Sequence, residues 1–553
     1  MSSSFPWLTV LGVVPLVGAL LILVLPRRSA ALARPIALAT SLVALLVGVG
    51  AATQFDWSGG EGQFQLTETH AWIPQFGVSY ALGVDGIALA LILMSLILVP
   101  ICLLAAWDDV APDDGRRLQT YMALMLVLET FMIGVFAARD VFLFYVFFEA
   151  MLIPVYFLIG MYGGARRQAA AMKFLLFSLA GGLIMLVGVI ALYLQGPGGD
   201  DGFLVERLTG LEIGSATERW IFIAFFIAFA VKAPMWPVHT WLPDAAAASR
   251  PAVATLLVGV LDKVGTYGMI RFCLQLFPEA SQWATPVVVT LAVFSILYGA
   301  ILAIGEPDIM RLIAFTSVSH FGFIVLGIFA FTSVAQSGAN FYMVNHGFAT
   351  AGLFLVAGML IARRGSQRID DYGGWQRATP WLAGAFLVAG LATLSLPGLS
   401  TFVSEFLVIA GSWSTQPVAT AFAVWGVVLA AIYVLLMYKR IFTGPPPVVD
   451  PEGAGTDRGE GEAPATAELP YVRADLDEGV TPARLTAPLR DLGWREKAVV
   501  APVVIALVVL GFFPGPVLDT LDPAVERTLQ IVGVSDPAPS VPADAGSTSG
   551  SDH

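Results

Sequence analysis

The sequence predicts an all-α polytopic membrane protein, and two observations support this fold class. Hydrophobic residues make up 57% of the 553 residues and charged residues 13%, with a mean hydropathy of +0.79. Soluble domains carry about 25% charged residues, so this chain is too apolar to be one. The apolar runs are mostly about 20 residues long, which at about 1.5 Å of rise per residue matches a hydrocarbon core of about 30 Å. Helices are therefore the expected membrane-spanning elements.

These runs predict about fourteen spans, with ends placed to within about four residues. The predicted spans cover residues 5–25, 35–54, 85–107, 119–138, 141–161, 171–194, 219–240, 251–275, 284–305, 311–331, 338–362, 380–412, 417–441 and 498–518. The first run is not expected to be a cleavable signal peptide. It lacks a basic leader, and Arg27 and Arg28 follow where a small-residue cleavage site would lie.

Arginines collect in alternate loops. The loops after odd-numbered spans contain Arg27, Arg28, Arg34, Arg116, Arg117, Arg166, Arg167, Arg363, Arg364, Arg368 and Arg377. The even-numbered loops contain little beyond Arg139, Arg207, Arg219 and Arg271, and residues 55–84 contain neither lysine nor arginine. Basic residues concentrate in cytoplasmic loops, so the odd-numbered loops are predicted to be cytoplasmic and both termini to lie on the outer side.

Two polar segments stand apart from the spans. Residues 442–497, rich in Pro, Gly and acids, are predicted to be a mobile cytoplasmic loop, and residues 519–553 a disordered C-terminal tail. Cys102 and Cys273 are too few for an iron–sulfur cluster or a structural zinc site. The sequence also lacks a glycine-rich phosphate-binding loop. We therefore expect no cofactor and no metal on this chain.

Two lysines lie well inside predicted spans, away from the span ends, Lys232 in the seventh and Lys263 in the eighth. A lysine at mid-helix costs about 2.5–3.5 kcal/mol on insertion scales, so such residues usually face a bundle interior or a wet cavity. The pKa of lysine also falls readily on burial, so a buried lysine can release a proton where arginine cannot. These lysines are therefore candidates for proton transfer.

Four acids lie in similarly apolar surroundings. They are Glu129 in the fourth span, Glu149 in the fifth, Asp262 beside Lys263, and Glu405 in the twelfth. A nearby acid and lysine hold each other charged, whereas separating them lets the lysine deprotonate. The competing interpretation is that these charges form static ion pairs in a structural spacer.

Two histidines, His320 and His346, occupy the neighbouring tenth and eleventh spans. An imidazole can accept and pass on a proton near neutral pH at small energetic cost. A single membrane histidine can equally serve only to hydrogen-bond a facing helix. Together with lysines and acids on separate spans, the two histidines favour a proton relay.

Prolines interrupt two of the spans that carry these charges. Pro234 and Pro237 are expected to break the seventh span just after Lys232, and Pro397 the twelfth span before Glu405. Broken helices at corresponding places in two halves indicate a transporter built from internal repeats. We therefore predict helices 1–3 over residues 1–114, a first five-helix repeat over 115–275 and an inverted second repeat over 284–441. A simple kink is the alternative for either break taken singly.

Five motifs carry a family resemblance. FFEAMLIPVYFLIG, VKAPMWPVHTWLPDA, LDKVGTYGMIRF, DIMRLIAFTSVSHFGF and NHGFATAGLF resemble the core motifs of the antiporter-like proton-channel subunits of respiratory complex I, which multisubunit sodium/proton antiporters and membrane-bound hydrogenases share. The resemblance covers about residues 115–441. In the twelfth span the M-type members have glutamate, whereas L-type, N-type and antiporter subunits typically have lysine. Glu405, together with the lack of a long lateral helix, makes this chain similar to the M type, and the resemblance is to members of actinobacterial type. The bias to Ala, Gly and Arg over Lys indicates a GC-rich genome.

The resemblance implies roles for individual residues. Six positions match a proton path: the coupled pair Glu149 and Lys232, the central Lys263, the linking His320 and His346, and the terminal Glu405. A secondary set comprises Glu129, Asp262, His239, Asp244, Pro234, Pro237 and Pro397. The chain departs from the family's frequent residues at Ala246, Met310 and Thr401, so no role is carried over to these three positions.

The resemblance also implies a function. The chain is expected to translocate protons in the membrane arm of a respiratory NADH:quinone oxidoreductase, in a bacterial inner membrane, between L-type and N-type neighbours. FMN, iron–sulfur clusters and quinone would be bound by partner subunits. The alternatives are a subunit of a sodium/proton antiporter or membrane-bound hydrogenase, a spacer that has lost transport, and, with least support, an independent solute carrier.

Overall fold

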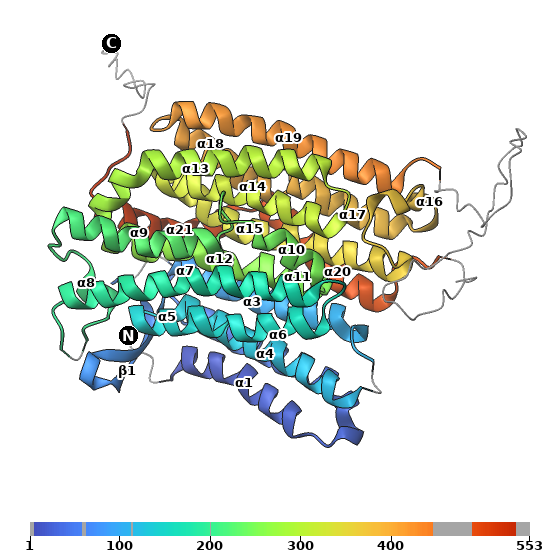
Figure 1. The fold of residues 1–553 in the computed structure, drawn as a ribbon, viewed down its shortest axis with the longest axis horizontal. Coiled ribbons are helices and arrows are strands. Elements are labelled where there is room, and N and C mark those ends of the chain that lie inside the picture. Colours follow the sequence, from blue (N-terminus) through green and yellow to red (C-terminus); the bar gives the residue numbers. More distant parts are fainter. Residues whose placement is uncertain (1–4, 58–61, 112–113, 200, 446–488, 538–553) are drawn as a thin grey trace, which may run out of the picture.

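The computed structural model describes residues 5–57, 62–111, 114–199, 201–445 and 489–537, in which long helices lie side by side (Figure 1). The helices are α1 (Trp7–Val24), α2 (Ala33–Thr53), α3 (Gly86–Ala105), α4 (Gly115–Ala137), α5 (Val141–Ala150), α6 (Leu152–Tyr162), α7 (Arg167–Gln195), α8 (Val205–Leu208), α9 (Ser215–Lys232), α10 (Trp241–Ala248), α11 (Pro251–Leu256), α12 (Lys263–Gly268), α13 (Pro278–Gly305), α14 (Ile309–Phe329), α15 (Ser333–Arg364), α16 (Trp375–Ala378), α17 (Pro380–Thr393), α18 (Ser400–Trp413), α19 (Pro417–Phe442), α20 (Trp494–Phe512) and α21 (Gly515–Val532). The strands are β1 (Gln65–Ile73) and β2 (Val78–Val84).

The described residues include 11 helices long and apolar enough to cross a membrane, or up to 12 if α20 and α21, which meet at 72°, count as one span. The chain is thus a multi-pass membrane protein. The other two predicted spans, the seventh and the twelfth, are each divided into two helices. The total of fourteen spans stays a prediction.

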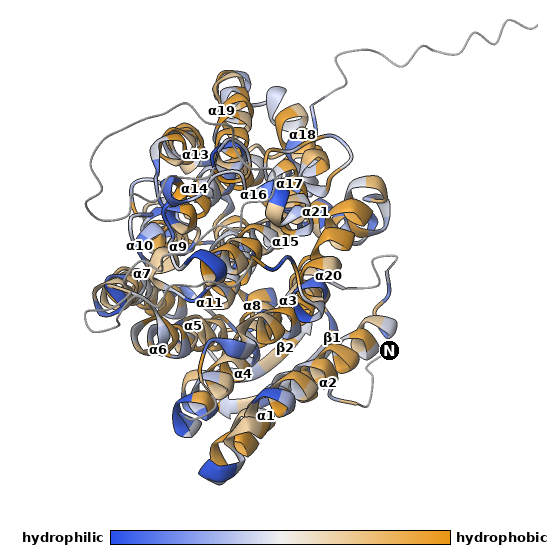
Figure 2. Cartoon of the chain, turned by 90° about the vertical axis from the view of Figure 1, so that its right-hand side faces the viewer, coloured by the Kyte–Doolittle hydropathy of each residue, from blue (hydrophilic) through white to orange (hydrophobic). Residues whose placement is uncertain are grey.

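Apolar side chains cover the outside of the bundle as well as its core. Figure 2 shows apolar residues along most helices, including α1 and α2 at one edge. Leu46 on α2 and Val418 on α19 are 70% and 71% exposed. Exposed leucine and valine side chains along whole helices suit contact with lipid or with the apolar helices of a partner subunit.

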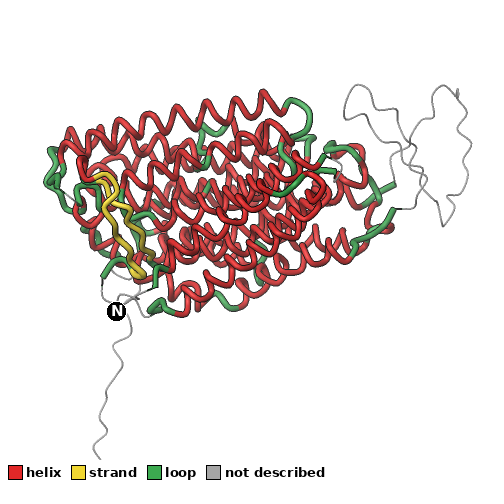
Figure 3. The backbone as a smooth tube through the Cα atoms, turned by 90° about the horizontal axis from the view of Figure 1, so that it is seen from below, coloured by secondary structure: helices red, strands yellow, loops and turns green. Residues whose placement is uncertain are grey.

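The expectation of an all-α protein is wrong between the second and third spans. β1 and β2 form an antiparallel hairpin there, at one end of the bundle (Figure 3). Gly77 forms its turn with φ of +66°, a conformation that glycine adopts without strain. The threonine, tryptophan and isoleucine residues of QLTETHAWI are residue types that favour strands. The hairpin is held to the bundle, since Ser79 N donates to Asp140 Oδ2 over 2.9 Å.

The expectation of disorder from residue 519 is also wrong, because α21 extends to Val532. Its sequence places Leu521, Val525 and Leu529 four residues apart, and all three are buried. Such a stripe is typical of an amphipathic helix, although acids on the opposite face make the segment resemble a polar tail. Of the predicted cytoplasmic loop, residues 446–488 lie outside the described residues, and α20 begins at Trp494.

Candidate functional site

The seventh span breaks directly after Lys232. α9 ends at this residue and α10 begins at Trp241, with Pro234 and Pro237 between them. Proline cannot donate a backbone hydrogen bond, so the break frees carbonyl groups that need other partners at this depth. The Trp241 indole donates to the Val231 carbonyl over 2.9 Å and satisfies one of them. The break therefore presents Lys232 at a helix terminus inside the bundle.

The twelfth span breaks in a similar way before Glu405. α17 ends at Thr393 and α18 begins at Ser400, with Pro397 in the connection. The Thr401 hydroxyl donates to the Ala392 carbonyl, and the Asn345 amide donates to the Ser400 carbonyl over 2.8 Å. Thr401, to which no family role was carried over, thus satisfies the backbone of the break.

Glu149 and Lys232 lie close together without forming an ion pair. The Lys232 ammonium is 4.9 Å from the ring centroid of Phe148, the residue preceding Glu149. Neither Lys232 Nζ nor Glu149 Oε1 has a hydrogen-bond partner in the described part of the chain. Gly182 on α7 provides the space for the carboxylate, because any Cβ at this position would clash with Glu149 Oε1. Lys232 therefore lies beside the helical turn that carries Glu149, and no ion pair or hydrogen bond among the described residues fixes the two side chains to each other.

Lys263 lies in the interior of the bundle, on the eighth span. This span is a continuous helix over Pro251–Leu274 in which two π-helical turns flank α12. Lys263 is fully buried, donates to the Val258 carbonyl over 2.6 Å and contacts His346 Nδ1 at 2.7 Å. π-Helical turns within α-helices are frequent at functional sites. Lys263 is thus in direct contact with His346.

A series of polar contacts continues from His346 to His320. The two imidazole rings have centroids 5.3 Å apart, and both residues are buried. His346 Nε2 also lies 3.2 Å from the Thr350 hydroxyl, and His320 Nε2 lies 3.2 Å from the Tyr433 hydroxyl. Each histidine therefore has a hydroxyl partner that fixes its ring.

Tyr342 joins the histidines to Glu405. Its ring centroid lies 5.9 Å from that of His320, and its hydroxyl donates to Glu405 Oε2 over 2.7 Å. The Ser395 hydroxyl donates to the same oxygen over 2.5 Å. Two hydroxyl donors suit a carboxylate that is ionised. Lys263, the two histidines and Glu405 are thus brought into one line across four elements.

Tyr342, Thr350, Tyr433 and Ser395 were missed by the sequence reasoning, which considered only charged residues and histidines. Spacing could have revealed two of them. Tyr342 and Thr350 lie four residues before and four after His346, on the same face of α15. The contacts of Tyr433 and Ser395 depend on how distant helices pack, which sequence spacing does not indicate.

Three residues of the secondary set lie elsewhere. Glu129 is buried in α4, and neither of its carboxylate oxygens has a hydrogen-bond partner among the described residues. His239 packs edge-on against Tyr298, with ring centroids 5.2 Å apart. Asp244 forms ion pairs with Lys173, at 2.6 Å, and with Arg311. None of these contacts joins the three residues to the line from Lys263 to Glu405.

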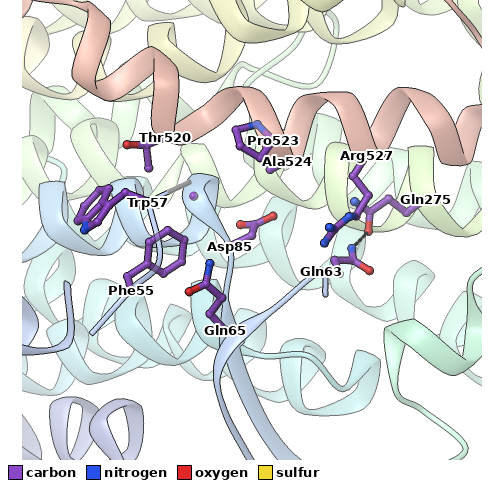
Figure 4. Close-up of a pocket in the computed structure, with 11 residues that line it drawn as sticks. Phe55, Trp57, Gln63, Gln65, Asp85, Gln275, Thr520, Pro523, Ala524 and Arg527 are labelled. Carbon is purple, nitrogen blue, oxygen red and sulfur yellow. Dashed lines mark hydrogen bonds between the residues drawn. The ribbon is translucent and has the colours of Figure 1, made fainter. Parts of the chain in front are cut away.

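A second buried polar cluster lies at the hairpin end of the bundle. Asp85, which caps the N-terminus of α3, forms an ion pair with Arg271 of the eighth span, and their side chains are 9% and 1% exposed. Figure 4 shows Asp85 beside a small cavity of about 20 Å³ that Gln65, Gln275 and Arg527 also line. Arg271, counted above among loop arginines, is therefore part of the core.

Breaking this ion pair should destabilise the protein. In an Arg271→Leu variant the Asp85 carboxylate stays buried without its partner, which typically costs about 3–5 kcal/mol. We expect a lower thermal unfolding temperature of the purified protein in detergent. A double variant, Asp85→Asn with Arg271→Leu, removes both charges while keeping a helix-capping side chain, and should recover much of the loss. An unchanged unfolding temperature in the single variant would contradict this assignment.

Comparisons with known proteins agree on one family. Residues 138–432 match the family described as NADH:quinone oxidoreductase/Mrp antiporter, and residues 64–135 match the amino terminus of NADH-ubiquinone oxidoreductase chain 4. NADH-quinone oxidoreductase subunit M of Mycobacterium tuberculosis is 46% identical over 98% of this chain and 97% of its own length. The corresponding subunit of Escherichia coli is 35% identical over 95% and 97%.

Solved structures show the same architecture. A chain of respiratory complex I from Thermus thermophilus superimposes with a TM-score of 0.79 at 30% identity, over 95% of this chain and 100% of that one. A chain of the Mrp complex from Dietzia has the same TM-score at 24% identity, over 95% and 98%, and shows the fold alone. The chain therefore belongs to the NADH-quinone oxidoreductase subunit M family, the antiporter-like subunits of the membrane arm of respiratory complex I.

Proposed function

We propose that this chain moves protons across the membrane through a buried relay formed by Glu149, Lys232, Lys263, the two histidines and Glu405. Redox chemistry on other subunits, which bind FMN, iron–sulfur clusters and quinone, would drive the transfer. A change in the separation of Glu149 and Lys232 would alter the proton affinity of Lys263, because buried charges interact strongly at low dielectric. The proton would then pass through His346 and His320 towards Glu405.

One observation carries this proposal. Polar groups form a near-continuous series from Lys263 Nζ to Glu405 Oε2, through contacts of 2.7 Å at each end and two histidine rings with centroids 5.3 Å apart. Buried titratable groups are costly in a membrane and persist where they serve transport. A scaffold without transport would need only enough polar contacts to pack its helices.

The broken helices support an inverted-repeat architecture. One break follows Lys232 in residues 115–275 and the other precedes Glu405 in residues 284–441, so each proposed repeat carries one break beside one titratable group. Five crossings per repeat would invert the second relative to the first. The hairpin end of the bundle, poor in arginine, would face outward together with both termini, and the arginine-rich loops would face the bacterial cytoplasm.

The partners follow from the family. We infer that other antiporter-like subunits, the L-type and N-type chains, flank this one in the membrane arm. The exposed apolar faces of helices such as α19 and α2 are long enough to bury against such neighbours or against lipid. A sodium/proton antiporter subunit is the second candidate, and the residue at position 405 disfavours it because antiporter subunits typically have lysine there.

Alanine substitution of the coupled pair tests the function. We expect Lys232→Ala and Glu149→Ala to lower the number of protons moved per NADH oxidised by the assembled complex in proteoliposomes, since each removes one partner of the pair. Lys439→Ala changes an exposed lysine at the end of α19 and serves as the matched control. Full proton-to-electron coupling at normal turnover in both site variants would overturn the proposal.

A further inference from the structure

Asp262 is a buried acid to which the relay above assigns no task. It directly precedes Lys263, at the end of a π-helical turn, and its exposed fraction is 0%. Neither of its carboxylate oxygens has a hydrogen-bond partner among the residues that the structure describes. An unpaired carboxylate in an apolar interior is strongly unfavourable unless nearby positive charges or water compensate it. The position therefore calls for a functional explanation.

Asp262 lies on the face of the eighth span that packs against the end of α9. Gly265, three residues further along, marks this face, because a Cβ there would come within 2.5 Å of Ala233 N and Phe229 O. Residues three apart share a helix face, so Asp262 is directed towards the terminus that carries Lys232.

The two lysines have different surroundings, although Asp262 directly precedes Lys263 and faces the helix end that carries Lys232. Lys263 is directed to the opposite side, where it contacts Val258 O and His346 Nδ1. Lys232 Nζ, like the Asp262 oxygens, is buried without a hydrogen-bond partner in the described part of the chain. The series of contacts described above offers no intermediate group for the step from Lys232 to Lys263.

We propose that Asp262 carries the proton between Lys232 and Lys263 and thereby joins the two halves of the route. This inference rests on the proposed function. The Lys232 ammonium gives a proton to the Asp262 carboxylate, leaving a neutral amine and a carboxylic acid. The acid then gives its proton to the neutral amine of Lys263, which restores the carboxylate and forms an ammonium. No direct ion pair within 4 Å joins Asp262 to either lysine among the described residues, so a bridging water or a side-chain rotation completes each step.

The competing explanation is a fixed counter-charge. In that case Asp262 never binds a proton and only holds the two lysines charged. Substitutions of Asp262 distinguish the two roles. Asparagine has a similar shape to aspartate but cannot bind the proton, whereas glutamate can bind it. They also differ in spectroscopy, since only the relay forms a protonated carboxyl group during turnover.

The experiment uses the complete complex in proteoliposomes. We expect Asp262→Asn to lower the protons moved per NADH at least as far as Lys263→Met does, while Asp262→Glu retains a measurable share. NADH oxidation by an artificial electron acceptor reports assembly of the redox subunits in each variant. Full coupling in Asp262→Asn would overturn the relay role. Loss of coupling in Lys232→Ala alongside full coupling in Asp262→Asn would overturn this inference alone, whereas full coupling in both would overturn the proposed function.

Infrared spectroscopy provides the readout that a fixed counter-charge would not change. Turnover-induced difference spectra of the wild-type complex should contain a carbonyl band of a protonated carboxylic acid that is shifted in Asp262→Glu. The Asp262→Glu comparison remains available if the asparagine variant does not assemble. An identical band in the wild type and Asp262→Glu would mean that the band arises elsewhere, and would overturn the proposal.

Discussion

Replacing Lys263 with methionine should nearly abolish proton transfer through this subunit. Methionine has a similar length and packs well in apolar surroundings, so the fold should persist. The substitution removes the ammonium group that contacts both the Val258 carbonyl and His346 Nδ1. Loss of a positioned proton donor typically slows transfer by about 100-fold or more.

The measurement is the number of protons moved per NADH oxidised by the complex in proteoliposomes. Lys439→Met, at an exposed position of α19, controls for loss of a lysine as such. Other subunits of the complex would continue to move protons, so the ratio should fall to an intermediate value or turnover should stall. A normal ratio at normal turnover in Lys263→Met would remove Lys263 from the path.

The second large effect is expected for Glu405→Gln. Glutamine keeps the shape of the side chain and can still accept the hydroxyl hydrogen bonds of Tyr342 and Ser395. It cannot bind and release a proton, so transfer should stop at the end of the line while the broken helix around it stays intact. The expected result is a loss of protons per NADH similar to that in Lys263→Met.

Two further variants sharpen this test. Glu279→Gln changes an exposed acid at the start of α13 and should have no effect. Tyr342→Phe removes the hydroxyl that donates to Glu405, and should slow turnover less than Glu405→Gln, because a water can take the place of the hydroxyl. An effect of Glu405→Gln no larger than that of Glu279→Gln would show that Glu405 lies outside the path.

Sequence reasoning located the charged positions of the site because burial of charge in a membrane is costly. Lys232, Lys263 and Glu405 are conspicuous in apolar segments, and Pro234 and Pro397 mark the positions at which the helices break. These features depend on composition and on local backbone chemistry, which are readable along the chain. The roles assigned to these residues remain proposals.

The contacts between these residues could not be predicted from the sequence. Lys263 and His346 are 83 residues apart in the chain, and whether they meet depends on how their two helices are rotated about their axes. Tyr433 contacts His320 although the two are 113 residues apart in the chain. In the sequence, nothing distinguishes Tyr433 from other aromatic residues of apolar helices. The hairpin was missed because its strands are short and β1 is largely polar, and α21 was missed because its acids hide a short amphipathic pattern next to a long apolar span.

The most direct test of the relay is a map of the assembled complex at a resolution that reveals ordered water, recorded during turnover and at rest. We expect water molecules to bridge Lys232, Asp262 and Lys263, and to fill the remaining gaps between His320 and Glu405, in at least one of the two states. Lys232, Lys263 and Glu405 enclosed in separate dry pockets in both states would contradict the account.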